Sequence, residues 1–506
     1  MRNLFVLFVF GILISCAHDK SNDYSVPKKV VIAGKVNNMD PGNRDVDLYV
    51  NRPGLRQVVA STKADSAGFF NASFEIYTPT DVWVQYKMNI LVLVQPGDSI
   101  FVEFDGQHNQ RPQILETIQF GGDGVKINQE AAKFQAMYFS DPIYTDWDAK
   151  SRSKETYDVG QYVLYLDTLQ QRIDALFQRF MTEVKPGKVV ETWARTYIEE
   201  DYYDALSFYP MEYLMANDSL RGKWSVPDGY YDALLNRLPV GENMLVSGYA
   251  LTNFVNRFHY GYARKKIWEE EANRQYLTPE GFTVGPTEIM DSLTVYGIIK
   301  YTPDTLLRQM VLTELFAQNL ENSDVRLYEK YQHLADQYIV EPFLKEPLKE
   351  MYTDLKDRLE NPVMATDALL KKLENTSAQK LFDSVLVANK GKVIYLDCWA
   401  TWCGPCISEM PNSKKLKEEL EGKDVAFVYL CVDSEEELWK ASLAQLQIGG
   451  EHYFLSKEQS TDLRKAFEIQ GIPYYFLIDQ QGVILDKGSH LRPNIMKEKI
   501  LELLGS

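Results

Sequence analysis

The pattern of apolar and polar residues changes twice along the chain. From residue 28 to 106, short runs of β-branched and aromatic residues alternate with turn signals, which predicts a small all-β sandwich or barrel. From 124 to 375 apolar positions recur at helical spacing, and from 378 to 506 strand-like and helix-like runs alternate. We therefore expect a multidomain protein with an N-terminal all-β domain, a central all-α region and a C-terminal α/β domain.

Neither of the first two regions contains a catalytic motif. In the β region the expected strands are 29–36, 46–50, 69–76, 82–86, 90–94 and 99–104. In the helical region one helical face carries Val190, Trp193, Ala194, Tyr197 and Ile198, which are expected in the core rather than in a peptide groove. Thr302 is predicted to cap a helix that has Pro303 at its first position. We expect these regions to act as spacer or docking modules.

The first sixteen residues have the features of an export signal. Arg2 precedes an apolar run from Leu4 to Ile14, which is shorter than the ~20 residues that a membrane-spanning helix needs. The run ends in Leu-Ile-Ser-Cys, which resembles a bacterial lipoprotein box. The resemblance implies that residues 1–15 are removed, that Cys16 is lipidated, and that 16–27 form a tether. The alternative is an ordinary cleaved signal with an incidental cysteine.

Composition excludes one class of partner. The 506 residues contain 54 Lys and Arg against 71 Asp and Glu, a net charge of -17, and no local basic stripe. A field of this sign repels nucleic acid, so we expect no nucleic-acid partner.

The strongest chemical signal is Trp402-Cys403-Gly404-Pro405-Cys406, directly after an apolar strand-like run at 393–399. Two cysteines at this spacing suit dithiol-disulfide exchange. Cys403 would lie at a helix N-terminus, where free backbone N–H groups favour a thiolate, the attacking form. Cys406, one turn further, is placed to attack the mixed disulfide that results. The expected redox disulfide is therefore Cys403 with Cys406.

The cysteines could instead bind an iron-sulfur cluster or a zinc ion. Cys398, Cys403, Cys406 and Cys431 copy the spacing of a plant-type iron-sulfur site. However, Cys398 and Cys431 fall inside runs that read as buried parallel strands, where cysteine packs as a small hydrophobe. No second CxxC or His pair completes a zinc site. We expect no metal and no cofactor.

Asp397 lies in an otherwise apolar strand, six residues before Cys403. Burial should raise the pKa of this carboxyl and make it a proton acceptor. The alternative is a structural carboxylate whose oxygens are satisfied by a nearby lysine or by backbone groups.

Residues 378–506 resemble the thioredoxin fold, specifically the TlpA/ResA-like branch of extracytoplasmic thiol-disulfide oxidoreductases. The resemblance rests on the WCGPC sequence, on Glu409-Met410-Pro411 after the second cysteine, and on Ile472-Pro473 before a strand. It implies that Asp397 deprotonates Cys406 and that Pro473 follows a cis peptide bond beside the disulfide.

Further site residues follow from the same resemblance. The backbone of Ile472 would pair with an extended substrate, and Trp402 and Tyr474 would also contact it. Tyr474 replaces the common threonine, which puts the shape of that groove in doubt. Glu409 either tunes the active site or is an exposed helix glutamate.

These residues predict a membrane-tethered oxidoreductase of the cell envelope. It would be lipid-anchored at the inner or the outer membrane, with its body in the periplasm, and would reduce or isomerise disulfides of exported proteins. A membrane electron donor of unknown identity would supply it. A lipoprotein binding or assembly factor with secondary thiol chemistry is the alternative. A peroxidase is a weaker third, because the Pro-x-x-x-Thr-x-x-Cys arrangement of peroxiredoxins is absent before Cys403.

Overall fold

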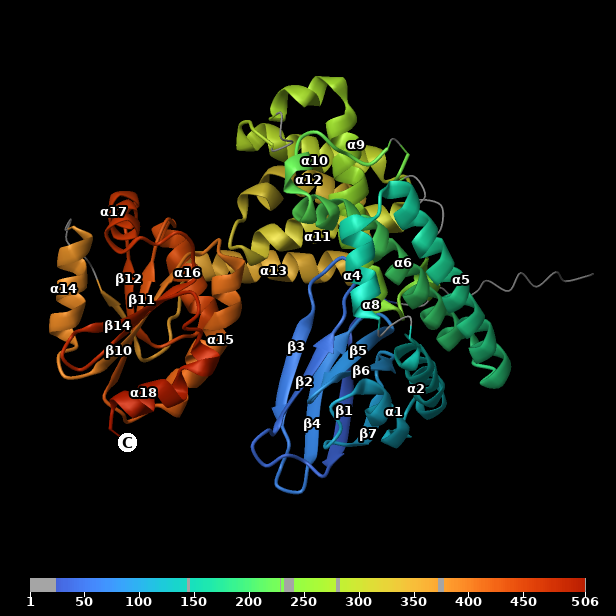
Figure 1. Ribbon diagram of the computed structural model, residues 1–506, viewed down its shortest axis with the longest axis horizontal. Helices are drawn as coiled ribbons and strands as arrows, with labels where there is room; N and C mark the ends of the chain where they lie inside the picture. The colour runs from blue at the N-terminus through green and yellow to red at the C-terminus, as the bar shows by residue number, and fades with distance from the viewer. Residues whose placement is uncertain are drawn as a thin grey trace, which may run out of the picture.

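The computed structural model describes residues 24–142, 146–227, 229–231, 241–278, 283–371 and 377–505 (Figure 1). The expected signal peptide, Cys16 and most of the tether lie outside these residues. Within the described part of the chain, no helix combines the length and the apolar character needed to cross a membrane.

The N-terminal region contains two antiparallel-rich sheets that face each other, with strand orders β4-β1-β7-β8 and β3-β2-β5-β6. Every second residue of β1 and β2 is buried, so each strand turns one face to the core and the two sheets pack face to face. The strands are β1 Lys28–Asn37, β2 Asp45–Val50, β3 Val58–Lys63, β4 Phe69–Ile76, β5 Thr80–Gln85, β6 Asn89–Val94, β7 Ser99–Asp105 and β8 Gln119–Gly122. All the expected strands are present, whereas β3 and β8 were not predicted. β3 is an edge strand with no buried position, so its apolar signal is weak.

The central region is helical. Its helices are α1 Arg111–Thr117, α2 Val125–Ser140, α4 Trp147–Thr156, α5 Val159–Glu183, α6 Lys188–Ala216, α8 Gly248–Arg257, α9 Arg264–Glu269, α10 Thr287–Tyr301, α11 Thr305–Glu321, α12 Arg326–Tyr338 and α13 Pro342–Glu360. Short turns at Asp218–Leu220, Glu242–Met244 and Glu271–Tyr276 and a π-helical segment at Phe258–Ala263 connect some of them. The apolar face predicted on α6 is buried. The cap predicted at Thr302 is wrong, because Asp304 caps α11 by accepting from Leu307 N–H at 2.8 Å.

The β region and part of the helical region share one hydrophobic core. Side chains of β1 to β7 pack together with those of α2, α5 and α6. A buried carboxylate also connects the two regions by hydrogen bonds. Asp81 of β5 accepts from Trp193 Nε1 of α6 at 3.0 Å and from the backbone N–H of Tyr249 in α8 at 2.8 Å. The range 28–106 therefore shares its core with part of 124–375, while the remaining helices pack in a second core.

The C-terminal domain is a six-stranded sheet of order β14-β13-β10-β11-β12-β9, covered by helices on both faces (Figure 1). One face packs against α15, α16 and α18, and the other against α14 and α17. The strands are β9 Ala368–Lys371, β10 Val393–Trp399, β11 Val425–Cys431, β12 Gly450–Phe454, β13 Tyr474–Ile478 and β14 Ile484–Gly488. The helices are α14 Ala378–Ala388, α15 Gly404–Glu419, α16 Glu436–Leu446, α17 Lys457–Phe467 and α18 Lys497–Leu503, with a 3-10 turn at Pro493–Ile495.

Strand β9 corrects the expected boundary at residue 378. It pairs in parallel with β12, although it precedes α14 and lies within the range assigned to the helical region. The C-terminal sheet therefore begins at residue 368.

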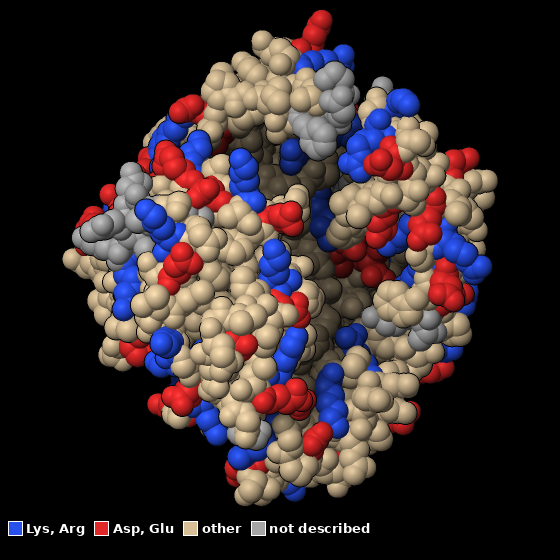
Figure 2. Space-filling model, turned by 60° about the vertical axis from the view of Figure 1, so that its left-hand side comes forward, with Lys and Arg blue, Asp and Glu red and all other residues tan. Residues whose placement is uncertain are grey.

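The C-terminal domain contacts both other regions. Its α16 packs beside α13, and Ser442 Oγ of α16 also lies 3.5 Å from Ser323 Oγ in the turn between α11 and α12. Lys415 of α15 donates to Asp45 at the start of β2 at 3.1 Å. Figure 2 shows basic and acidic side chains interspersed over one face of the molecule, around a deep hollow. The two charge signs alternate there, so no single-sign patch dominates this face.

Candidate active site

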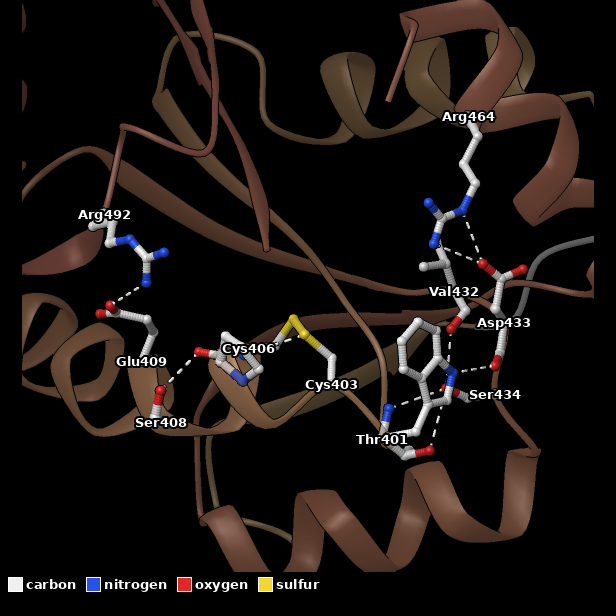
Figure 3. The surroundings of a disulfide bond; sticks show 12 residues. Thr401, Cys403, Cys406, Ser408, Glu409, Val432, Asp433, Ser434, Arg464 and Arg492 are labelled. Atoms are coloured by element: carbon white, nitrogen blue, oxygen red, sulfur yellow. Dashed lines mark hydrogen bonds and ion pairs between the residues drawn. A yellow bond between two sulfur atoms is a disulfide. The ribbon is translucent and has the colours of Figure 1, made fainter. Parts of the chain in front are cut away.

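A disulfide joins Cys403 and Cys406 where β10 passes into α15 (Figure 3). The buried apolar run of β10 ends at Trp399, and α15 begins at Gly404 with Pro405 in its first turn. Cys403 caps the helix, because its Sγ accepts a hydrogen bond from the backbone N–H of Cys406 at 3.2 Å. The same N–H group and the helix dipole would stabilise a thiolate at this sulfur after reduction.

The two cysteines differ slightly in access. Cys403 is 4% exposed and Cys406 is 1% exposed, while Gly404 and Pro405 between them are exposed. Cys403 is therefore the slightly more accessible residue of the pair.

The indole of Trp402 is held beside this turn. Trp402 is 55% exposed, and its Nε1 donates to the backbone oxygen of Asp433 at 2.7 Å. Asp433 has a positive φ of 47° and pairs with Arg464, whose Nε lies 2.8 Å from Oδ2. Thr401 N–H donates to Ser434 Oγ at 3.1 Å. An exposed aromatic surface with a fixed orientation can contact an incoming chain.

Asp397 lies in β10 on the sheet face that also carries the disulfide, since Tyr395 and Trp399 of the same face pack with Cys403 and Cys406. It is 1% exposed, and its Oδ1 has no hydrogen-bond partner among the described residues. Burial raises the pKa of Asp397 well above its ordinary value, and the charge of Glu409 raises this pKa further. The structure places no lysine or backbone donor on Oδ1, so the alternative of a satisfied structural carboxylate is wrong for this oxygen.

Glu409 is held one turn along α15 from Cys406. Its side chain is 13% exposed, accepts from Arg492 Nη1 at 2.6 Å and accepts from Asn412 Nδ2 at 3.1 Å (Figure 3). The alternative of an exposed helix glutamate is therefore wrong.

The segment before β13 comes from a distant part of the chain. The Ile472–Pro473 peptide bond is cis, as the resemblance implies, and Pro473 is buried while Ile472 is half-buried. Tyr474 packs against the core on the opposite face of the sheet from the disulfide. Tyr475, which was not predicted, packs instead in the core that includes Cys403 and Cys406.

The remaining cysteines point in opposite directions. Cys431 packs in the core that includes the disulfide, whereas Cys398 packs in the core of the other face. Burial raises the pKa of Cys431 to about 12 and raises the pKa of Cys398 well above its ordinary value. The four cysteines therefore do not converge on one point, as an iron-sulfur cluster requires, and both free thiols stay protonated.

A family model described as Redoxin matches residues 368–503. "Thioredoxin-like protein YneN" of Bacillus subtilis (strain 168) is 31% identical over 142 residues, which cover 28% of this chain and 77% of that protein. The chain belongs to the TlpA/ResA-like family of thioredoxin-fold proteins. Both the predicted family and the predicted fold class are confirmed.

Other members of the TlpA/ResA-like family match over shorter stretches. A "Thiol-disulfide oxidoreductase ResA" of Bacillus cereus is 30% identical over 98 residues, 19% of this chain and 55% of that protein. The chain spans 55% to 63% of the length of the first curated relatives that it matches. The solved thioredoxin domain of a thiol-disulfide oxidoreductase from Bacteroides vulgatus is 25% identical, covering 24% of this chain and 84% of that chain with a TM-score of 0.22.

Proposed function

We propose that this protein is a thiol-disulfide oxidoreductase that acts on disulfides of exported proteins. One observation carries the proposal: the Cys403–Cys406 disulfide caps helix α15 on the sheet face where Asp397 is buried with an unpartnered oxygen. A dithiol needs a stabilised attacking thiolate and a base for the second thiol, and these two features supply them.

The reaction runs in two displacements from the reduced state. The Cys403 thiolate attacks a substrate disulfide, forms a mixed disulfide and releases the first substrate sulfur as a thiolate. Asp397 then takes the proton of Cys406, whose thiolate attacks Cys403 Sγ, re-forms the disulfide of the structure and releases the second substrate thiolate. Two electrons pass from the dithiol to the substrate, and a membrane dithiol donor returns the protein to its reduced state.

The proposed location is the cell envelope, with lipid on Cys16 and the body of the protein in the periplasm. It is supported by the apolar run of residues 4–14 and by the Leu-Ile-Ser-Cys sequence that ends it. The exposed indole of Trp402 and the half-buried Ile472 would contact the substrate chain.

Turnover of a disulfide substrate by the purified protein tests the proposal. The double variant Cys403→Ser/Cys406→Ser should lose all turnover, whereas Cys398→Ser, which changes a buried thiol on the opposite sheet face, should keep it. Lack of turnover by the wild-type protein with a dithiol reductant, or full turnover by the double variant, would refute the proposed activity.

A further inference from the structure

A buried phenol lies directly beside Asp397. Tyr475 of β13 is the residue opposite Asp397 in the antiparallel pairing with β10, and paired residues place their Cβ atoms about 4.5–5.5 Å apart on one sheet face. Tyr475 is fully buried, and its hydroxyl has no hydrogen-bond partner among the described residues. Asp397 Oδ1 also lacks a partner. Burying a polar group without a partner is destabilising, so two such groups on paired residues call for a functional explanation.

The other phenols around Asp397 are already engaged. Tyr395 of the same strand donates to the backbone oxygen of Leu491 at 2.6 Å. Tyr429, the partner of Asp397 in β11, shares a hydrogen bond of 2.9 Å with Ser413. Of the three tyrosines whose charge interacts with Asp397, Tyr475 alone keeps its hydroxyl free within the part of the chain that the structure describes.

Charged groups lead from this phenol to the surface. Burial raises the pKa of Tyr475, the charges of Asp397 and Glu409 raise it further, and Arg492 lowers it, so all three groups lie within electrostatic range of the phenol. Exposure increases along this series, because the side chain of Glu409 is 13% exposed and that of Arg492 is 41% exposed. The Tyr475 ring is held parallel to Tyr395, with centroids 5.6 Å apart and planes inclined by 9°.

We propose that Tyr475 is a positioning residue whose hydroxyl carries the proton from Asp397 toward Glu409 and the solvent. The inference rests on the proposed function, in which Asp397 receives the proton of Cys406. The Tyr475 hydroxyl accepts the proton of the Asp397 carboxylic acid as it donates its own to the Glu409 carboxylate, each transfer passing through a bridging water because no direct hydrogen bond joins these groups. Glu409 then releases the proton to bulk water, so one proton leaves and the electrons stay on sulfur.

The test compares Tyr475→Phe with Tyr429→Phe in the full-length protein. Both variants remove one hydroxyl and keep a ring beside Asp397. Only Tyr475→Phe removes a hydroxyl that has no hydrogen-bond partner among the described residues, because the Tyr429 hydroxyl is bonded to Ser413. Reduced protein is mixed with an excess of a small disulfide, and the resolving step is followed as release of the second thiol between pH 5 and 9. Tyr475→Phe should slow this step about tenfold and shift its pH profile, while Tyr429→Phe should stay within about twofold of wild type with an unchanged profile.

Four outcomes would overturn either the inference or the proposed function on which it rests. An unchanged pH profile in Tyr475→Phe overturns it, and so does an equal slowing in both variants that follows a loss of thermal stability. If Tyr475→Phe does not fold, Glu409→Gln takes its place, and an unchanged profile there also overturns it. Absence of turnover in the wild-type protein would instead refute the proposed function.

Discussion

At Cys403 the sulfur already accepts a backbone hydrogen bond from Cys406, whereas Cys406 lies one turn deeper and is 1% exposed. In the proposed mechanism, the two sulfurs have different tasks that fit this asymmetry. The attacking sulfur needs access and a stabilised thiolate, and the resolving sulfur needs a base within the protein.

The first prediction concerns trapped intermediates. Cys406→Ser should form a stable mixed disulfide with a protein substrate, because Cys403 can still attack but nothing resolves the product. Cys403→Ser should form none, since it removes the attacking sulfur and Cys406 lies one turn further into α15. Non-reducing electrophoresis of both variants measures the adducts. Equal trapping by the two variants would contradict this division of roles.

The second prediction uses the pH dependence of stability. The pKa of Asp397 is raised in the folded protein, so the folded state binds more protons than the unfolded state between the unfolded and folded pKa values. Stability should therefore fall as pH rises through that window. Asp397→Asn should remove this loss and raise the free energy of unfolding at neutral pH by roughly 1 kcal/mol or more, since one pKa unit corresponds to about 1.4 kcal/mol.

Thermal unfolding of the oxidised protein at several pH values measures this effect. The same variant should resolve mixed disulfides slowly, because it has lost the base. A variant that is less stable than wild type at neutral pH would contradict the account of Asp397.

Sequence reasoning found the residues whose signals are local. The Cys403 and Cys406 spacing and a carboxylate within an apolar strand are visible in one short stretch. Arg492 could not be found this way, because it pairs with Glu409 across 83 residues. The sequence analysis named Tyr474 instead of Tyr475. Only the pairing register of β13 with β10 shows which of these two tyrosines lies on the same sheet face as Asp397.

At the scale of elements, β9 changes where the C-terminal domain begins. This short strand covers the edge of β12, and its burial is intermediate or low at every position. A strand of four residues without a buried position gives no apolar alternation, and its partner lies about eighty residues downstream. The alternation of strands and helices in 378–506 could be predicted from the sequence, whereas β9, the first strand of the sheet, could not.

The third prediction compares two fragments, residues 362–506 and 378–506. The longer fragment keeps β9 and should reduce a small disulfide at close to the full-length rate, because its sheet and both helical layers are complete. The shorter fragment should unfold at a lower temperature, since the edge of β12 loses its partner. Thermal unfolding and turnover measure the difference. A longer fragment that is folded but inert would show that the helical region completes the active site.

At the scale of the whole molecule, the chain carries its catalytic domain at one end and its expected anchor at the other. The periodicity of the sequence predicted the three kinds of region in the right order, because it reports element type. It did not predict that the strands of residues 28–105 and helices α2, α5 and α6 pack in one core, because periodicity does not say which faces meet.

The fourth prediction tests the anchor. Cys16→Ala should release the protein from membranes or block its processing, because several acyl chains hold a protein far more firmly than the marginal binding of one. Ser15→Ala, which keeps a small residue before the cysteine, is the matched control and should remain in the membrane fraction. Membrane fractionation decides between them. Unchanged membrane association of Cys16→Ala would indicate a different anchor.

The shared core also sets an order of events during synthesis. Its members extend from Val30 to Val246, so the first β-strands to leave the ribosome have no complete packing partner until almost half of the 506 residues have been made. Strand faces that wait for α6 stay open to chaperones and proteases during that interval. The C-terminal sheet has no such delay, because its core draws only on residues from 364 onward. The oldest part of the nascent chain therefore stays without its full core while about two hundred further residues are made.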